Sequence, residues 1–410
     1  MTQSIRTLPV VEKWDCQCCG LCCHGNTIIL DKEDLSKLRS QQWEKHPEYR
    51  GVKTVVRESL LGGRHVLAKR ADGACVFLNQ EGRCRIHAAH GADAKPAICR
   101  MFPLQVVTHD RTALLTLRRS CPSAAADEGR ALDKHLAPLK RSGLAAQFAS
   151  PQTRPPAIAR AARRSWREFL AAADVLERLT TDARLPLVRR LLHGLRFCTL
   201  LDECKISRVR EESWDELLRC LEASAIENSG EFLRDPRQPP ARGTQVVIQQ
   251  IGSHFIRSYP GFTVTSSWRE RWQILLMSTK FARGKGTVPP VHPEFPPTTF
   301  EDLQRPLGAM DHEVIAPLNR LFETHALSKY YAIVGHKRSL VESFRSLALL
   351  YPLGLWLLRL VIGEREPKQD DVVNIVVALE RGQGLTGLSR AATAMANSQQ
   401  LESTIAWYAR

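Results

Sequence analysis

The run CQCCGLCC, residues 16–23, constrains this chain more than any other feature of its sequence. Four of its cysteines follow the pattern C-x2-C-x2-C-C: Cys16, Cys19, Cys22 and Cys23. Two-residue spacers let consecutive thiolates turn toward one metal centre, and Gly20 gives the backbone the freedom that a tight turn needs. Cysteines this dense would repel one another as bare thiolates, so the run predicts a metal site.

A second group of cysteines lies downstream, each in a segment that restricts the backbone. The group consists of Cys75, Cys84, Cys99 and Cys121. A turn between the first two can fold both onto one centre, prolines flank the third, and the fourth begins a helix, where the helix dipole favours the thiolate. Eight thiols exceed the needs of one centre. Two metal centres, or one centre with additional redox or supporting cysteines, are both open, and sulfur ligands suit zinc and iron–sulfur clusters equally.

The cysteines also divide the chain into two parts. Nine of the twelve lie between Cys16 and Cys121, and the sequence after them has a helical hydrophobic period near 3.6 residues. We therefore expect a mainly α protein: a small, irregular α+β cysteine-rich metal module at residues 1–130, followed by a larger helical domain at residues 131–410. Cys198, Cys204 and Cys220 fall on amphipathic helices with no ligand spacing, and we expect them to be spectators.

Local patterns predict particular elements within the first part. Residues 26–41 read as a short strand and then a helix capped by Asp31, with Asp34 at the third helical position. Two further short strands are expected at residues 64–70 and 74–80, and a β-hairpin is expected at residues 104–119 with its turn around His109, which we expect to be solvated.

The overall composition predicts a soluble, cytosolic chain. The N-terminus has no apolar run long enough for a signal peptide, and a cytosolic location keeps thiols reduced. The apolar stretch 347–362 contains Pro352 and Arg359 and is short for a membrane span, so it predicts two buried helices broken at the proline. The net charge of +15 is spread along the chain, and no nucleic-acid motif accompanies it. We therefore expect neither a membrane span nor a nucleic-acid partner.

The segments CQCCGLCC, CVFLNQEGRCRIH and KPAICRMFP together resemble the YkgJ-type cysteine-cluster family, a family of zinc- or iron-chelating domains, over about the first 125 residues. The segment around Cys121 and the long helical tail also resemble, more weakly, the flagellin lysine-N-methylases. Those proteins carry a [4Fe–4S] cluster and use S-adenosylmethionine. The resemblance implies as metal ligands Cys16, Cys19, Cys22, Cys23, Cys75, Cys84, Cys99 and Cys121.

Other residues near the cysteines have weaker claims to the site. His24 and His87 could replace a thiolate, although hydrogen bonding to sulfur is the commoner role of such histidines. Lys95 and Arg100 could offset the charge of a thiolate-rich centre, and a plain surface role is nearly as common. The tryptophans at positions 166, 268, 272 and 356 are expected to be packing residues.

Three functions are consistent with these patterns. The first is a metal- or cluster-binding protein whose helical domain binds a protein partner or substrate. The second is a protein-lysine N-methylase that uses S-adenosylmethionine, and the third is a zinc-stapled interaction protein. The chain lacks the glycine-rich turn of conventional methyltransferases, the phosphate-binding loop G-x-x-x-x-G-K-[ST] and the C-x3-C-x2-C triad of radical enzymes. No catalytic residue can be assigned from the sequence.

Overall fold

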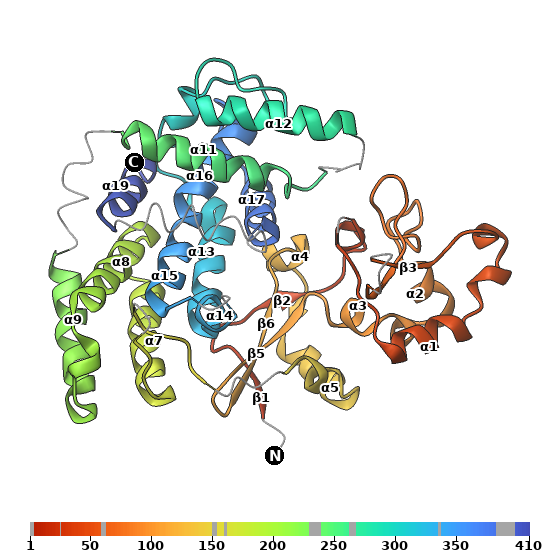
Figure 1. The fold of residues 1–410 in the computed structure, drawn as a ribbon, viewed down its shortest axis with the longest axis horizontal. Coiled ribbons are helices and arrows are strands. Elements are labelled where there is room, and N and C mark those ends of the chain that lie inside the picture. The colour runs from red at the N-terminus through yellow and green to blue at the C-terminus, as the bar shows by residue number, and fades with distance from the viewer. Residues whose placement is uncertain are drawn as a thin grey trace.

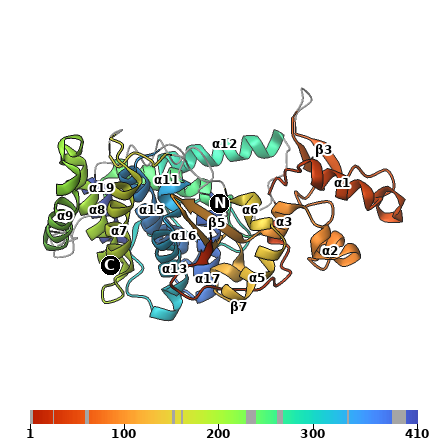
Figure 2. The same ribbon diagram turned by 90° about the horizontal axis from the view of Figure 1, so that it is seen from below.

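The computed structural model describes residues 4–24, 26–58, 63–149, 154–159, 162–228, 239–261, 268–334, 338–382 and 398–410. It has the expected fold class, a small α+β region followed by a larger helical region. In Figure 1 the part of the first region with α1 (Lys32–Ser40), α2 (Arg85–His90) and β3 (Val55–Arg57) lies to the right of the view, and the helices of the second region fill the left and centre. Figure 2 shows that this part extends away from the helical region.

Three strands of the first region form a sheet that lies beside the helical region in Figure 1. Its order is β1-β6-β5, where β1 is Ile5–Thr7, β5 is Leu104–His109 and β6 is Thr112–Leu117. Strands β5 and β6 pair antiparallel from Leu104↔Leu117 to His109↔Thr112, which confirms the expected hairpin. The expectation that His109 is solvated was wrong. Its side chain is 7% exposed because the hairpin packs against the helical region, and neither ring nitrogen has a hydrogen-bond partner among the described residues.

The cysteine-rich region contains short elements joined by irregular backbone. Its helix α1 begins as expected, because the Asp31 side chain accepts a hydrogen bond from the Asp34 N–H at 2.8 Å. The strand expected before α1 is reduced to a single bridge at Ile29, and residues 74–80 form isolated bridges and turns where a strand was expected. The remaining elements are β2 Lys13–Trp14, α1 Lys32–Ser40, β3 Val55–Arg57, β4 His65–Leu67, α2 Arg85–His90, α3 Ala97–Met101, α4 Pro122–Ala125 and β7 Arg130–Ala131.

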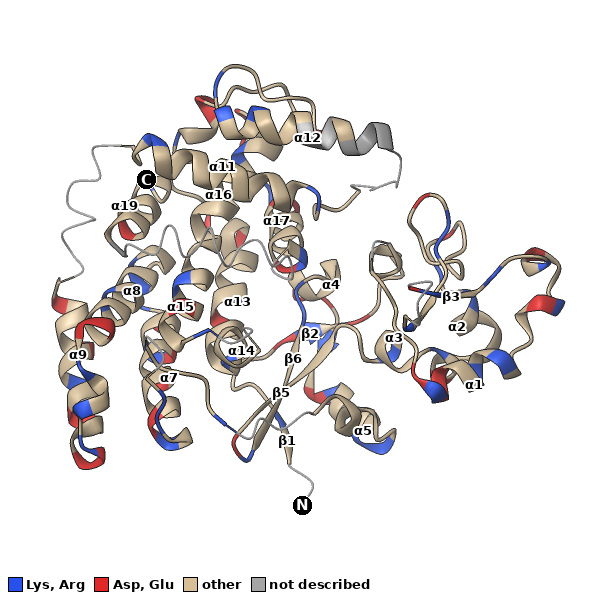
Figure 3. Ribbon diagram, viewed as in Figure 1, with Lys and Arg blue, Asp and Glu red and all other residues tan. Residues whose placement is uncertain are grey.

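Helices form the rest of the described chain. They are α5 Asp133–Arg141, α6 Leu144–Phe148, α7 Trp166–Thr181, α8 Leu187–Glu203, α9 Trp214–Asn228, α11 Arg242–Ile256, α12 Trp268–Arg283, α13 His312–Ser328, α14 Tyr330–Ile333, α15 Leu340–Ala348, α16 Leu350–Ile362, α17 Gln369–Gly382 and α19 Ser398–Tyr408. Figure 3 shows basic and acidic residues interspersed along α1, α7 and α9.

The apolar stretch near residue 350 forms two helices, as expected. The break falls at Leu349 and not at the proline itself: Pro352 lies in the first turn of α16, where its missing N–H costs no hydrogen bond within the helix. Residues Leu340–Ile362 are apolar and long enough to span a membrane, but 83% of their most apolar 18-residue window is buried inside the fold. The pair α15 and α16 therefore contributes to the main core.

Three apolar clusters organise the interior. One lies within the cysteine-rich region around Trp43, Phe77 and Ile86. A second joins the sheet to α5 and α6, so it crosses residue 130. The largest fills the helical region and includes Trp356 and Cys198, both fully buried as expected for packing residues. Trp272, by contrast, is 52% exposed, so it is not the packing residue that we expected; the side chain of Trp268 lies outside the described residues.

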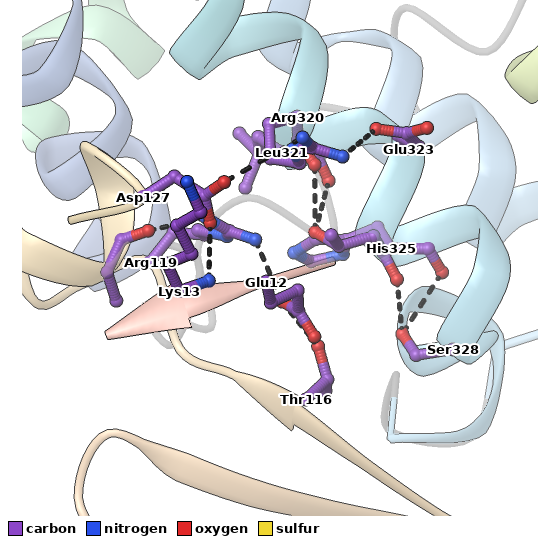
Figure 4. A network of polar contacts seen from close by, with 12 residues as sticks. Glu12, Lys13, Thr116, Arg119, Asp127, Arg320, Leu321, Glu323, His325 and Ser328 are labelled. Carbon is purple, nitrogen blue, oxygen red and sulfur yellow. Dashed lines mark hydrogen bonds and ion pairs between the residues drawn. The ribbon is translucent and has the colours of Figure 1, made fainter. Parts of the chain in front are cut away.

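A buried polar network ties the cysteine-rich region to the helical region (Figure 4). At its centre, Arg119 is fully buried and its Nη2 lies 2.8 Å from Oε1 of Glu12. The backbone N–H of Arg119 donates to Oε2 of Glu380 on α17 at 3.0 Å, and Glu380 also pairs with His325 on α13. Asp127 contacts both Arg119 and Arg320 of α13. The network fixes residues 118–121 relative to α13 and α17.

Candidate metal centre

The cysteine run folds into a tight loop followed by one turn of 3-10 helix, Leu21–Cys23. Gly20 precedes this turn with φ of 69°, a left-handed conformation that suits glycine. The Cys23 N–H donates to the Gly20 carbonyl at 2.8 Å, which closes the turn. The Cys75 N–H then donates to the Cys23 carbonyl at 2.8 Å, and this bond brings the second group of cysteines to the first.

The turn between Cys75 and Cys84 packs directly on the cysteine run. The Asn79 N–H donates to the Arg83 carbonyl at 2.9 Å, which folds the segment back on itself. At the tip, Gly82 has φ of 74°, and a Cβ atom there would stand 2.6 Å from the Cys18 carbonyl oxygen. No side chain fits at that distance, so the close approach of the two loops requires glycine at residue 82.

We expect Gly82→Ala to lower the metal content of the purified protein to well under half that of the wild type, because the clash pushes the two cysteine loops apart. Gly51→Ala is the matched control. Gly51 has the same φ as Gly82, 74°, but nothing lies within 4 Å of its would-be Cβ, so both variants place an alanine at the same positive φ and only one has the clash. Equal metal content in the two variants, measured by elemental analysis, would contradict this interpretation.

Six of the eight predicted ligands line one pocket of about 770 Å³. They are Cys19, Cys22, Cys23, Cys75, Cys84 and Cys99. Two loops and α3 therefore supply sulfur to a common space, as the sequence segments suggested. In the described part of the chain, no three Cys, His, Asp or Glu side chains lie close enough together to hold a single metal ion. The six thiols surround the pocket and do not meet at one point.

Cys16 and Cys121 do not line this pocket. Cys16 is exposed, and it raises the pKa of its neighbour Cys18, so these two thiols interact with each other. Cys18 is exposed, has φ of 55° and also lies outside the pocket lining. Cys121 is buried behind the pocket, within electrostatic reach of Cys19 and Cys22.

Burial and mutual proximity favour the protonated form of several of the thiols. Burial, with a smaller contribution from the nearby thiols Cys84 and Cys22, raises the pKa of Cys75 to about 11 and that of Cys99 to about 12. The pKa of Cys22 is raised chiefly by its contact with Cys23, whose Sγ lies 3.9 Å away. A bound cation reverses this effect because thiolates are the metal ligands, so loading of the centre releases protons.

The start of helix α4 acts on the pKa of Cys121 in the expected direction, but burial outweighs it. Burial raises the pKa of the Cys121 thiol to about 11, although the Ala124 N–H of the following helix α4 favours the thiolate. Helix α4 has only four residues, so its dipole is small compared with the cost of burying a charge.

Of the other residues considered for the metal site, two line the pocket and two do not. His24 and Lys95 line the pocket, and Lys95 is the cation that lowers the pKa of both Cys22 and Cys99. His87 lies on α2 outside the pocket lining, and Arg100 points to Asp93 at 3.6 Å. Lys95 is therefore placed to offset thiolate charge, whereas Arg100 has a carboxylate partner of its own.

The helical region supplies one wall of the pocket, which the sequence did not indicate. Arg257 and Ser258 follow α11, and Arg381 lies near the end of α17. Nη2 of Arg381 donates to the His24 carbonyl at 3.1 Å, so the cysteine loop is held directly by a residue 357 positions away. No spacing in the sequence marks such a contact, because it depends on how the two regions pack.

The comparison with protein families matches only the cysteine-rich region. Residues 15–122 match the family model CxxCxxCC, described as a putative zinc- or iron-chelating domain. No curated protein and no solved structure matches the chain. The matched residues begin just before the cysteine run and end just after Cys121, so they contain all eight cysteines predicted to bind metal.

Proposed function

Because residues 15–122 form a domain of the YkgJ-type cysteine-cluster family, we propose that the chain holds an iron–sulfur cluster in the cysteine-lined pocket and uses the helical region to bind a protein partner or substrate beside it. The observation that carries the proposal is the pocket itself, with six cysteines on its walls and a further wall from α11 and α17. We place the protein in the cytosol, where free thiols persist.

The donor set fits either metal chemistry, and the pocket size favours a cluster. Thiolate sulfur binds both zinc and iron–sulfur clusters. A single zinc ion takes four ligands that converge on one point, whereas the pocket of about 770 Å³ is far larger than one ion and its cysteines are spread around it. The residues that would hold a [4Fe–4S] cluster come from Cys19, Cys22, Cys23, Cys75, Cys84 and Cys99. Such a cluster supplies electron-transfer or Lewis-acid chemistry.

We expect protein purified without oxygen to be brown, with broad absorption at roughly 400 nm from charge transfer between thiolate and iron. Iron and acid-labile sulfide should be present in equal amounts by elemental and chemical analysis. Colourless protein with stoichiometric zinc would instead support the third function, a zinc-stapled interaction protein, and would overturn the cluster proposal.

A second candidate function is protein-lysine N-methylation from S-adenosylmethionine. The pocket volume supports it, since small-molecule sites in proteins usually measure about 300–1,000 Å³ and this pocket has room beyond the cysteines. Incubation of the loaded protein with labelled S-adenosylmethionine and cell extract tests this candidate. Label on a protein lysine supports it, and its absence leaves the binding function as the better account.

A further inference from the structure

The pocket has a second chemical character besides its thiols, on the side where the two regions meet. Three guanidinium groups line it there, those of Arg118, Arg257 and Arg381. Among the described residues, none of the three forms an ion pair with a carboxylate, although exposed arginines elsewhere in the chain do. The carboxylate in the pocket lining, Asp72, is engaged by Arg70 through two hydrogen bonds. The pocket lining therefore has no free carboxylate to pair with these arginines.

A buried hydroxyl completes this wall. Ser120 lines the pocket and is 7% exposed, and within the described part of the chain its Oγ has no hydrogen-bond partner. A buried hydroxyl without a partner costs free energy, and on a pocket wall a ligand, water or ion can supply the missing partner. Arg118 and Ser120 are held in place by the Arg119 residue between them, whose side chain and N–H belong to the buried network.

Balancing the thiolates does not account for all of these cations. Lys95 acts on Cys22 and Cys99, and Arg381 lies within reach of Cys22. Arg257 comes from the helical region, and Arg118 lies near Glu380 of the buried network. Together with the free hydroxyl of Ser120, these two arginines form a donor set suited to oxygen anions, because guanidinium groups pair with carboxylate and phosphate oxygens in bidentate geometry.

We propose that the pocket binds a small molecule through a carboxylate or phosphate group, held by Ser120, Arg118 and Arg257 beside the cysteine centre. This inference rests on the proposed function, since it places the ligand of that same pocket. The ligand enters with its anionic group against the wall made by residues 118–120 and the end of α11, and its remainder faces the cysteines. The Ser120 Oγ donates one hydrogen bond and the guanidinium groups supply the others.

Calorimetric titration of the metal-loaded protein at constant ionic strength tests the proposal. The probes are inorganic phosphate, succinate, and succinamide as an uncharged molecule of similar size. We expect one equivalent of phosphate or succinate to bind and succinamide to give no saturable heat. Binding of phosphate alone would identify a phosphoryl group as the natural anchor, and binding of succinate alone a carboxylate.

Two variants assign the binding to this wall. Ser120→Ala and Arg257→Gln should each weaken binding of the anion about tenfold or more, since hydrogen bonds to charged groups are strong. Arg305→Gln, an exposed arginine outside the pocket lining, should leave affinity unchanged. Removal of an unpartnered hydroxyl should not destabilise the ligand-free protein, so Ser120→Ala should unfold at the wild-type urea concentration or above.

The outcomes separate this inference from the proposed function because metal content is measured on the same samples. Normal metal content without anion binding, or equal loss of affinity in Arg305→Gln and Arg257→Gln, would overturn the anion site and leave the metal centre standing. Absence of metal from the wild-type protein would refute the proposed function, whatever the titration shows.

Discussion

Replacing Cys19 or Cys22 alone by Ser is expected to reduce bound metal to about a tenth of the wild-type content or less, because loss of one ligand weakens the whole coordination sphere. Cys22 has the strongest reason to be a ligand. It contacts Cys23, lines the pocket, and acts electrostatically on Cys75 and Cys99. Metal analysis of protein purified without oxygen measures the effect.

A combined variant serves as the matched control for the number of cysteines removed. It carries Cys18→Ser, Cys198→Ala, Cys204→Ser and Cys220→Ser, and it should keep near wild-type metal content. None of these four cysteines lines the pocket, and Cys198 is fully buried in the helical core, where Ala avoids burying a new hydroxyl. Loss of metal from the fourfold variant together with its retention in Cys22→Ser would show that the ligand assignment is wrong.

The two predicted ligands outside the pocket lining, Cys16 and Cys121, need their own single variants. Cys16→Ser tests whether the exposed start of the loop closes onto the centre when metal binds. Cys121→Ser tests a buried position behind the pocket. Both remain predicted ligands, and full metal content in either variant would remove that residue from the set.

Replacing Arg119 by Ala is expected to destabilise the protein by about 3–5 kcal/mol, the usual cost of removing one partner from a buried ion pair. The change leaves Glu12 buried without its guanidinium partner and removes a link to Asp127. Unfolding in urea, followed by circular dichroism, measures the loss. The helical signal should disappear at a lower urea concentration in the variant than in the wild type, with a similar slope.

Arg184→Ala provides the control for loss of an arginine ion pair at the surface. Its guanidinium lies 2.8 Å from Asp182, but the side chain is 88% exposed, so this variant should unfold at nearly the same urea concentration as the wild type. The double variant Glu12→Gln with Arg119→Met should recover part of the loss, because no buried charge is left unpaired. A cost for Arg119→Ala no larger than that for Arg184→Ala would mean that the buried network contributes little to stability.

The sequence predicted those parts of the fold that depend on residues close together in the chain. The cap of α1 depends on Asp31 and Asp34, three positions apart, and the hairpin of β5 and β6 depends on a short turn. Residues 74–80 were misassigned as a strand because a short run of apolar residues also suits a turn whose side chains are buried by other segments. His109 was misjudged for the same reason, since its burial comes from the helical region.

The same distinction holds for the candidate site: residues close together in the chain could be predicted, and residues brought in from distant helices could not. The cysteines were recognisable from their spacing, because ligands of one centre recur at short, fixed intervals. Arg257 and Arg381 could not be recognised, since they reach the pocket from helices far along the chain. Ser120 gave no signal either. A serine is common anywhere on a surface, and only its burial without a partner marks it.

The alternation of roles at residues 118–120 limits which changes of chain length this protein can tolerate. Arg118 and Ser120 line the pocket, whereas Arg119 enters the buried network, so a one-residue insertion or deletion between Leu117 and Cys121 would exchange their places. The same change at the exposed Asp110–Arg111 turn would leave that alternation intact. Insertions and deletions in natural relatives of this chain should therefore occur at the tip of the hairpin and be absent from its base.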